Sequence, residues 1–174
     1  GGFIKLYRSE DADLIVVALG SVLGTVKDAI DELRDDGLRV GVLGITTFRP
    51  FPAQAVCDAL SDDNRLQRLV VLERSLAPGA GGVVTADVRT ALATGGGGPR
   101  GPVIATVIAG LGGRPVTRDS LRSMLTSAER GELPAFSFLD LDTHLAETEL
   151  ARIRATRRSG PSAENILSDL AGRS

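Results

Sequence analysis

Hydrophobic residues along the chain occur in short continuous runs that alternate with longer stretches of helical period. The runs are DLIVVALGS, with a strand at about 14–19, LRVGVLGI, RLVVLER and GPVIATVIAG. A run that is apolar at every position is typical of a parallel strand covered on both faces. Between the runs, apolar residues recur at helical spacing, as in Val26, Ala29, Ile30 and Leu33. This alternation predicts an α/β fold with three layers, in which helices flank a mostly parallel sheet.

Turn-forming and small polar residues mark where the predicted helices begin and end. Thr25 is the predicted N-cap of the first helix, and Gly37 is its predicted stop. Pro52 fits the first turn of a short second helix that contains Cys57. Thr117 is the predicted start of a helix with a regular apolar face. These signals separate the predicted strands from the helices that connect them.

The pattern changes after Pro134. AFSFLDL predicts a short extended segment, and THLAETELARIRATRR and SGPSAENILSDLAG predict a charged amphipathic helix and a last short helix. Neither helix belongs to a βα unit, so we divide the chain into an α/β domain over 1–141 and a helical tail over 142–174. The apolar stripes of the tail fit packing on its own domain better than docking onto a partner chain.

Composition narrows the classes of function. Hydrophobic residues make up 43% of the 174 residues and charged residues 24%, with a formal net charge of -2, as in globular proteins without strong electrostatic bias. Aromatic residues make up 3%, and no basic stripe interleaves with them, so we expect no nucleic-acid partner. The chain lacks both an apolar run of about 18 residues and a signal-peptide pattern. We therefore expect a cytoplasmic protein without a membrane partner.

Few side chains offer catalytic or metal chemistry. Cys57 is the only cysteine and His144 the only histidine of the sequence. These counts exclude an internal disulfide, an iron-sulfur cluster held by this chain alone and a multi-His metal site. Cys57 fits a buried core thiol, and His144 lies in the tail, so no nucleophile and base can be paired. We predict no catalytic, cofactor-binding or metal-binding residue.

Two glycine-containing turns between a strand and a helix are candidate anion contacts. Gly20 and Ser21 follow the first strand, where backbone N–H groups and the helix dipole favour a phosphate or carboxylate. Arg114, in AGLGGRPVT, is a further candidate because a guanidinium binds anions. Neither turn has the spacing of the dinucleotide or P-loop motifs, and glycines in tight connections are common. An ordinary turn is therefore the simpler interpretation of both.

The segment ITTFRPFP ends the second strand in a stiff, charged corner. Pro50 and Pro52 fix φ and bias the residues before them toward extended conformations, so Arg49 is aimed in one direction. An arginine held in this way suits a carboxylate or phosphate on a facing domain. We predict an interdomain contact formed by Arg49 with Glu73 and Arg74, which end the third strand. The alternative is an exposed arginine on a rigid turn.

Four segments occur in an order and spacing found in one enzyme family. They are ADLIVVALGS, ELRDDGLRVGVLGITTFRPFP, RLVVLERSLAPGAGG and AGLGGRPVT. Through them, roughly the first three quarters of the chain resembles the 2-oxoacid:ferredoxin oxidoreductases of the pyruvate:ferredoxin oxidoreductase type. The resemblance implies domain II of the α part of such an enzyme, with a fold similar to the transketolase C-terminal domain.

The same resemblance implies the activity of a larger enzyme. That activity is oxidative decarboxylation of pyruvate or a related 2-oxoacid with coenzyme A, on thiamine diphosphate, with electrons passing through iron-sulfur clusters to ferredoxin. The chain contains neither a Gly-Asp-Gly motif for diphosphate and Mg2+ nor cluster-ligating cysteines. We therefore expect these cofactors on other domains or subunits, which would be its partners, and a structural and assembly role for a chain that is inactive alone.

Two alternatives fit the same pattern. The chain could be the C-terminal domain of a transketolase-like or branched-chain 2-oxoacid dehydrogenase, which would have a lipoyl-domain partner in place of iron-sulfur subunits. It could also be a stand-alone small-anion-binding module that uses the crevice at the carboxyl ends of the strands, where Gly20, Ser21, Arg49 and Arg114 would meet.

Overall fold

The computed structural model describes residues 2–61, 65–77, 81–95, 101–141, 148 and 151–152. The chain divides into two compact units, residues 1–140 and 141–174, and the central sheet with its flanking helices belongs to the first. Apart from 148 and 151–152, the predicted helical tail over 142–174 lies outside the described residues. Its helices, and the division of the chain into domains over 1–141 and 142–174, stay predictions.

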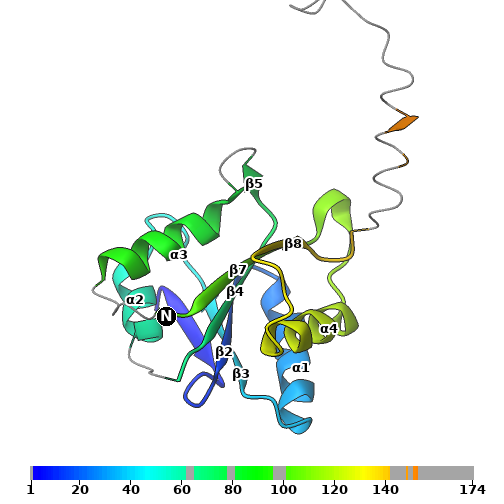
Figure 1. Ribbon diagram of the computed structural model, residues 1–174. Coiled ribbons are helices and arrows are strands. Elements are labelled where there is room, and N and C mark those ends of the chain that lie inside the picture. Colours follow the sequence, from blue (N-terminus) through cyan, green and yellow to red (C-terminus); the bar gives the residue numbers. More distant parts are fainter. Residues whose placement is uncertain are drawn as a thin grey trace, which may run out of the picture. The chain divides into compact units, whose positions relative to one another are not determined.

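A six-stranded sheet forms the centre of the first unit (Figure 1). Its strands are β1 (Ile4–Tyr7), β2 (Leu14–Leu19), β3 (Val40–Ile45), β4 (Arg68–Glu73), β7 (Val103–Ile108) and β8 (Phe136–Phe138). Their order across the sheet is β1-β3-β2-β4-β7-β8. All neighbouring pairs are parallel except β1 with β3. A separate ribbon is formed by β5 (Leu76–Ala77) and β6 (Gly81–Gly82).

Helices cover both faces of the sheet (Figure 1). They are α1 (Val22–Asp35), α2 (Ala53–Ser61), α3 (Val83–Thr94) and α4 (Arg118–Glu129), with a 3-10 turn η1 (Leu111–Gly113) before α4. On one face α1 packs beside α4, and on the other α2 packs beside α3. None of the helices that the structure describes is long and apolar enough to cross a membrane. This layering confirms the predicted α/β class with a mostly parallel sheet.

The continuous apolar runs are buried because each central strand contributes to two hydrophobic cores. Five of the six residues of β2 are buried. Its alternate residues Leu14 and Val16 face the core that α1 and α4 cover, whereas Ile15 and Val17 face the core that α2 and α3 cover. Successive side chains of a strand point to opposite faces, so a strand covered on both sides has no polar positions. Each such side chain stabilises the fold by about 1.5–3 kcal/mol.

The first helix begins earlier than its sequence predicts. Its N-cap is Ser21 and its first residue is Val22, so the prediction that Thr25 is the N-cap was wrong. The reason is Gly20, whose φ of +80° turns the chain from β2 directly into α1. Gly20 and Ser21 consequently lie at the start of α1 itself.

Two other predicted helix signals agree with the structure, whereas Pro52 directly precedes α2 instead of lying in its first turn. Gly37, at φ +90°, ends α1, and the N–H of Leu38 donates to the carbonyl of Leu33 at 3.0 Å in a helix-terminating turn. Thr117 is the N-cap of α4, where its hydroxyl oxygen accepts a hydrogen bond from the N–H of Ser120 at 3.2 Å. These local hydrogen bonds explain why the sequence marks both positions.

Candidate functional site at the carboxyl ends of the strands

The direction of strand order changes between β2 and β4. From β2 the chain passes through α1 to β3, and from β4 it passes through α3 to β7 on the opposite side. Because α1 and α3 cover opposite faces of the sheet, the loops that leave β2 and β4 diverge. Open α/β sheets bind ligands in the crevice outside the carboxyl ends of the strands at such a point.

A cavity of about 510 Å3 lies at this point of the sheet. Its volume falls within the range of small-molecule sites, roughly 300–1,000 Å3. Its apolar lining residues are Leu19, Val22, Phe48, Leu72, Val83, Val84, Ala109, Pro115 and Val116. Its other lining residues are Gly20, Ser21, Thr25, Glu73, Arg74, Ser75, Gly113 and Arg114. The walls thus come from the ends of β2 and β4, the first turns of α1 and α3, and the segment before α4.

The cavity brings together five of the six residues that the sequence singles out. The candidate anion contacts Gly20, Ser21 and Arg114 all line it, and so do Glu73 and Arg74 from the predicted interdomain contact. Arg49 lies outside this lining. Of the four residues that the sequence places in one crevice, Gly20, Ser21 and Arg114 thus line the cavity and Arg49 does not. The roles of all these residues stay predictions.

At the start of α1, Ser21 lines the cavity. This N-cap residue has helical backbone angles, φ −66° and ψ −22°, and its side chain makes no capping hydrogen bond. Its hydroxyl is therefore not committed to the helix. Beside it, a Cβ added to Gly20 would meet no atom within 4 Å, so the glycine serves the turn through its positive φ rather than by saving space.

Glu73 is buried, and its carboxylate caps the N-terminus of α3. The side chain is 4% exposed. Its Oε2 accepts a hydrogen bond from the N–H of Val84 at 2.8 Å, and its Oε1 accepts from the N–H and the Oγ1 of Thr85 at 3.1 and 2.7 Å. A carboxylate here satisfies N–H groups that a helix start leaves unpaired, and it faces the positive end of the helix dipole. The hydrogen bonds of Glu73 thus lie within the domain, and we limit the interdomain prediction to the arginines.

Two further residues complete this buried polar cluster. Thr106 on β7 donates from Oγ1 to the Oγ1 of Thr85 at 3.0 Å, and both threonines are 4% exposed. Gly82 makes room for the cluster, because an added Cβ would collide with Oε1 of Glu73. Sequence reasoning missed this arrangement. The available signal was an acidic residue closing an otherwise apolar strand, since burial of a charge requires partners.

Arg74 and Arg114 are held at the cavity by backbone carbonyl groups. The Nη2 of Arg74 donates to the carbonyl of Gly110 at 3.2 Å, and the Nη1 of Arg114 donates to the carbonyl of Asp140 at 2.7 Å. Gly110 has φ +71°, and an added Cβ would approach the Nε of Arg74 to 2.8 Å. Among the residues that the structure describes, neither arginine has a carboxylate within ion-pair distance.

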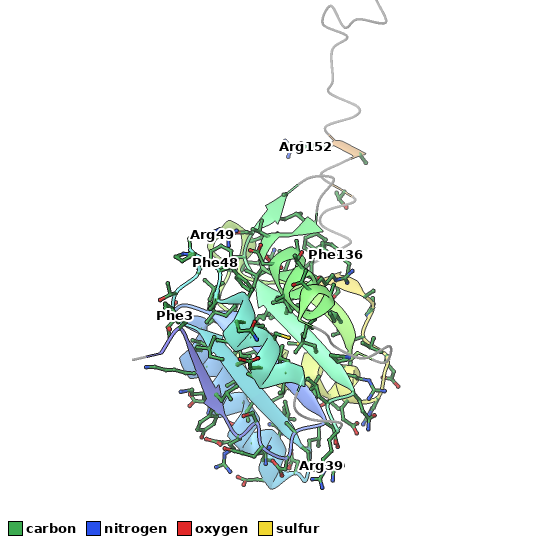
Figure 2. All side chains as sticks on the ribbon, turned by 90° about the vertical axis from the view of Figure 1, so that its left-hand side faces the viewer. Phe3, Arg39, Phe48, Arg49, Phe136 and Arg152 are labelled. Atoms are coloured by element: carbon green, nitrogen blue, oxygen red, sulfur yellow. The ribbon has the colours of Figure 1, made fainter. Side chains whose placement is uncertain are left out.

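Arg49 is fixed by two neighbours that belong to the same domain. Its Nη1 donates to Oδ2 of Asp87 on α3 at 2.7 Å, and its guanidinium carbon lies 3.9 Å from the centre of the Phe48 ring. Figure 2 shows Arg49 and Phe48 side by side at one end of the sheet, with Arg39 at the opposite end. The peptide bond between Arg49 and Pro50 is cis. The arginine is thus oriented by Phe48 and by Asp87, which sequence reasoning did not identify.

The described residues do not fit an iron-sulfur cluster or another metal centre. Within the described ranges, no group of three or more His, Cys, Asp or Glu side chains is placed to hold a metal ion. Cys57 is buried on α2 with 3% of its surface exposed, as the sequence predicts for a core thiol. An added Cβ on Gly95 would collide with its sulfur, which shows how closely this thiol is packed.

Fold and cavity together define a doubly wound α/β domain with a cavity at its topological switch point. The family model described as pyruvate:ferredoxin oxidoreductase core domain II matches residues 12–121. The chain therefore belongs to this family, which confirms the resemblance drawn from its four segments.

Relatives with assigned names support the same membership. Pyruvate synthase subunit PorA of Thermotoga maritima is 37% identical over 133 residues, and PorA of Methanocaldococcus jannaschii is 33% identical over 132 residues. These alignments cover 76% and 75% of this chain but 32% and 31% of the relatives. Ketoisovalerate oxidoreductase subunit VorA of Pyrococcus horikoshii is 35% identical over 108 residues, which are 62% of this chain and 26% of VorA. The chain thus spans about a third of the length of the PorA relatives.

A solved structure shares the fold. It is a 2-oxoglutarate:ferredoxin oxidoreductase from Magnetococcus marinus, solved with 2-oxoglutarate, coenzyme A and succinyl-CoA bound. The match has a TM-score of 0.54 and 22% sequence identity, and it covers 71% of this chain and 19% of the other. At this identity the likeness establishes the α/β fold and nothing about the ligands of this chain.

Proposed function

We propose that the chain acts as domain II of a 2-oxoacid:ferredoxin oxidoreductase, an enzyme that oxidatively decarboxylates a 2-oxoacid with coenzyme A and passes electrons to ferredoxin. The observation that carries this proposal is the family match over residues 12–121, supported by 37% identity to the PorA subunit of T. maritima. The names of these relatives make pyruvate the first substrate to test. The VorA relative makes ketoisovalerate the second.

In this proposal the cofactors belong to other parts of the enzyme. The chain contains no Gly-Asp-Gly motif, and its described residues do not fit a metal centre. Thiamine diphosphate with its Mg2+, and the iron-sulfur clusters, would therefore bind to other domains or subunits, which also act on coenzyme A and ferredoxin. The chain would supply a rigid scaffold, since its sheet is packed on both faces.

We further propose Arg49 as an interdomain contact. Its side chain is 55% exposed, although it is oriented by Asp87 and Phe48. Its hydrogen bonds to described residues all use Nη1, so Nε and Nη2 are available to a facing carboxylate. Arg74, the second arginine of the proposed contact, lines the cavity and donates to the carbonyl of Gly110.

Anaerobic purification of the assembly that contains this chain tests the domain proposal. We expect the chain to co-purify with thiamine diphosphate and with iron-sulfur clusters that give brown visible absorbance. A lipoyl-domain protein as partner, in a colourless preparation, would instead support the 2-oxoacid dehydrogenase alternative. A chain that purifies alone and without these cofactors would contradict the proposal.

A further inference from the structure

The cavity between the ends of β2 and β4 combines an apolar wall with two arginines that lack carboxylate partners among the described residues. We propose that it is a binding site for a small organic anion, with a carboxylate or phosphate head held by Arg74 and Arg114 and an apolar body against the wall. This inference concerns a site within the chain itself. It goes beyond the role of the domain in a larger enzyme and does not depend on that role.

Arg74 and Arg114 are arginines of the first unit without an ion pair among the described residues, as are Arg68, Arg89 and Arg130 outside the cavity lining. Six other arginines of the first unit are paired with Asp or Glu side chains within the described residues. The acidic residue of the cavity lining is Glu73, and both of its oxygens are occupied by the first turn of α3. Among the described residues, no carboxylate is therefore paired with Arg74 or Arg114, both of which line the cavity.

Backbone contacts hold both guanidinium groups without exhausting their donors. A guanidinium carries five N–H donors, and each arginine uses one of them for a carbonyl group, that of Gly110 or that of Asp140. The other donors form no hydrogen bond to a residue that the structure describes, so they can bind the oxygens of an anion. A side chain that is already oriented loses less conformational entropy on binding, so the arrangement favours affinity.

The apolar lining defines the rest of the ligand. Leu72 and Val84 come from the buried core, Phe48 from the segment after β3, and Val116 from the segment before α4. A bare inorganic anion would leave these surfaces in contact with water, whereas an alkyl or aryl body would cover them. The cavity should therefore prefer an anion with an apolar body over both inorganic phosphate and an uncharged molecule of the same shape.

Titration of the 174-residue chain with four probes tests this preference. The probes are hexanoate, hexyl phosphate, inorganic phosphate and 1-hexanol, and binding is measured by calorimetry or by chemical-shift changes. We expect saturable binding of hexanoate, hexyl phosphate or both, at least about tenfold tighter than phosphate or hexanol. The stronger of the two anions identifies the head group. Equal binding of hexanol, or no binding of either organic anion, would overturn the proposal.

Variants of the arginines locate the site. The double variant Arg74→Gln/Arg114→Gln should weaken anion binding at least about tenfold, because it removes both charges. The matched control is Arg89→Gln, since Arg89 is exposed, donates to the backbone carbonyl of Ile104 and lies outside the cavity lining. Unchanged binding in the double variant, or an equal loss in the control, would contradict the assignment.

A second variant protects the test against misfolding of the double variant. Val116→Phe should fill part of the cavity and weaken binding of hexanoate or hexyl phosphate at least about tenfold while both arginines are retained. Circular dichroism of each variant verifies the fold before titration. Anion binding that persists in a folded Val116→Phe chain would place the ligand elsewhere and overturn the proposal. Because this assay uses the chain alone, its failure would leave the co-purification test of the domain unaffected.

Discussion

Thr85 donates two hydrogen bonds to Oε1 of Glu73, from its backbone N–H at 3.1 Å and from its Oγ1 at 2.7 Å. This relationship joins the end of β4 to the first turn of α3, two elements that the ribbon β5–β6 separates in sequence. The N-terminus of α3 is thus capped by a residue from another element instead of by Gly82, its own N-cap. The same carboxylate forms part of the cavity lining, so the cap also fixes one wall of the candidate site.

Replacing Glu73 tests the energetic weight of this cap. Glu73→Gln removes the negative charge at the start of α3. It also replaces one of the two acceptor oxygens with an NH2 group, which cannot accept a hydrogen bond. We expect the free energy of unfolding to fall by about 1–3 kcal/mol. Urea denaturation followed by circular dichroism measures the change. The control Glu129→Gln, on the exposed end of α4, should change stability by less than about 0.5 kcal/mol. Equal stability of both variants would show that the cap contributes nothing.

Two glycine substitutions with opposite expected signs test the packing around the cap. An alanine Cβ at position 82 would collide with Oε1 of Glu73 and lie 2.9 Å from Cγ2 of Thr106, so Gly82→Ala should destabilise the fold by about 1–3 kcal/mol. At Gly24, within α1, an added Cβ meets nothing within 4 Å. Gly24→Ala should therefore raise stability by about 0.5–1 kcal/mol through helix propensity. A stabilising effect at position 82 would refute the described packing.

The interdomain proposal predicts a difference between two similar arginines. Arg49→Ala should weaken association with the rest of the enzyme, whereas Arg39→Ala should not. Both side chains are about equally exposed, 55% and 56%, and each pairs with an aspartate, but they lie at opposite ends of the sheet (Figure 2). Each exposed pair contributes only about 0–1 kcal/mol to the fold, so neither variant should unfold. Assembly is measured by co-purification, and equal assembly of both variants would remove the proposed contact.

The ion pair between Asp11 and Arg34 predicts a stability change with pH. Hydrogen bonds from Arg34, the larger cause, and its charge lower the pKa of Asp11 below its usual 3.8. A carboxylate with a lowered pKa in the folded state stabilises the protein above pH 3.8 and loses that contribution as the pH falls through its folded-state pKa. Asp11→Asn should therefore lower the urea midpoint at about pH 6, with a difference from the parent that shrinks toward about pH 2.

A control variant distinguishes the effect of the Asp11–Arg34 pair from a general loss of stability in acid. Asp28 is exposed on α1. Asp28→Asn should keep the urea midpoint close to that of the parent at both pH values. A difference between Asp11→Asn and the parent that grows on acidification would contradict the sign derived for Asp11.

The α/β core was predictable because its signals are local and repeated. Strands covered on both faces appear in the sequence as continuous apolar runs. Helices are recognised from the spacing of their apolar residues and from the residues that begin and end them, which are close together in the sequence. β1 was not predicted, since it has four residues, of which Lys5 and Leu6 are exposed, and it is defined by pairing with β3. The start of α1 was misplaced because the positive φ of Gly20 is a property of the fold.

The candidate site was predictable in place but less so in detail. Because the carboxyl ends of parallel strands meet at one edge of the sheet, we expected Gly20, Ser21, Arg49 and Arg114 near one another. Three of them line the cavity together with Glu73 and Arg74, and Arg49 does not. The partners that decide what each residue can do come from distant positions in the sequence. The carboxylate of Glu73 accepts hydrogen bonds from Val84 and Thr85 at the start of α3. The position of Glu73 at the end of a strand does not reveal these partners, because they come close only in the folded chain.

The most direct test of the central proposal is electron transfer by the native assembly that contains this chain. We expect the anaerobically purified assembly to reduce ferredoxin with pyruvate or ketoisovalerate, only in the presence of coenzyme A, and the 174-residue chain alone to show no such activity. Reduction that does not require coenzyme A, or an intact assembly with iron-sulfur clusters that oxidises no 2-oxoacid, would contradict a role as domain II of a 2-oxoacid:ferredoxin oxidoreductase.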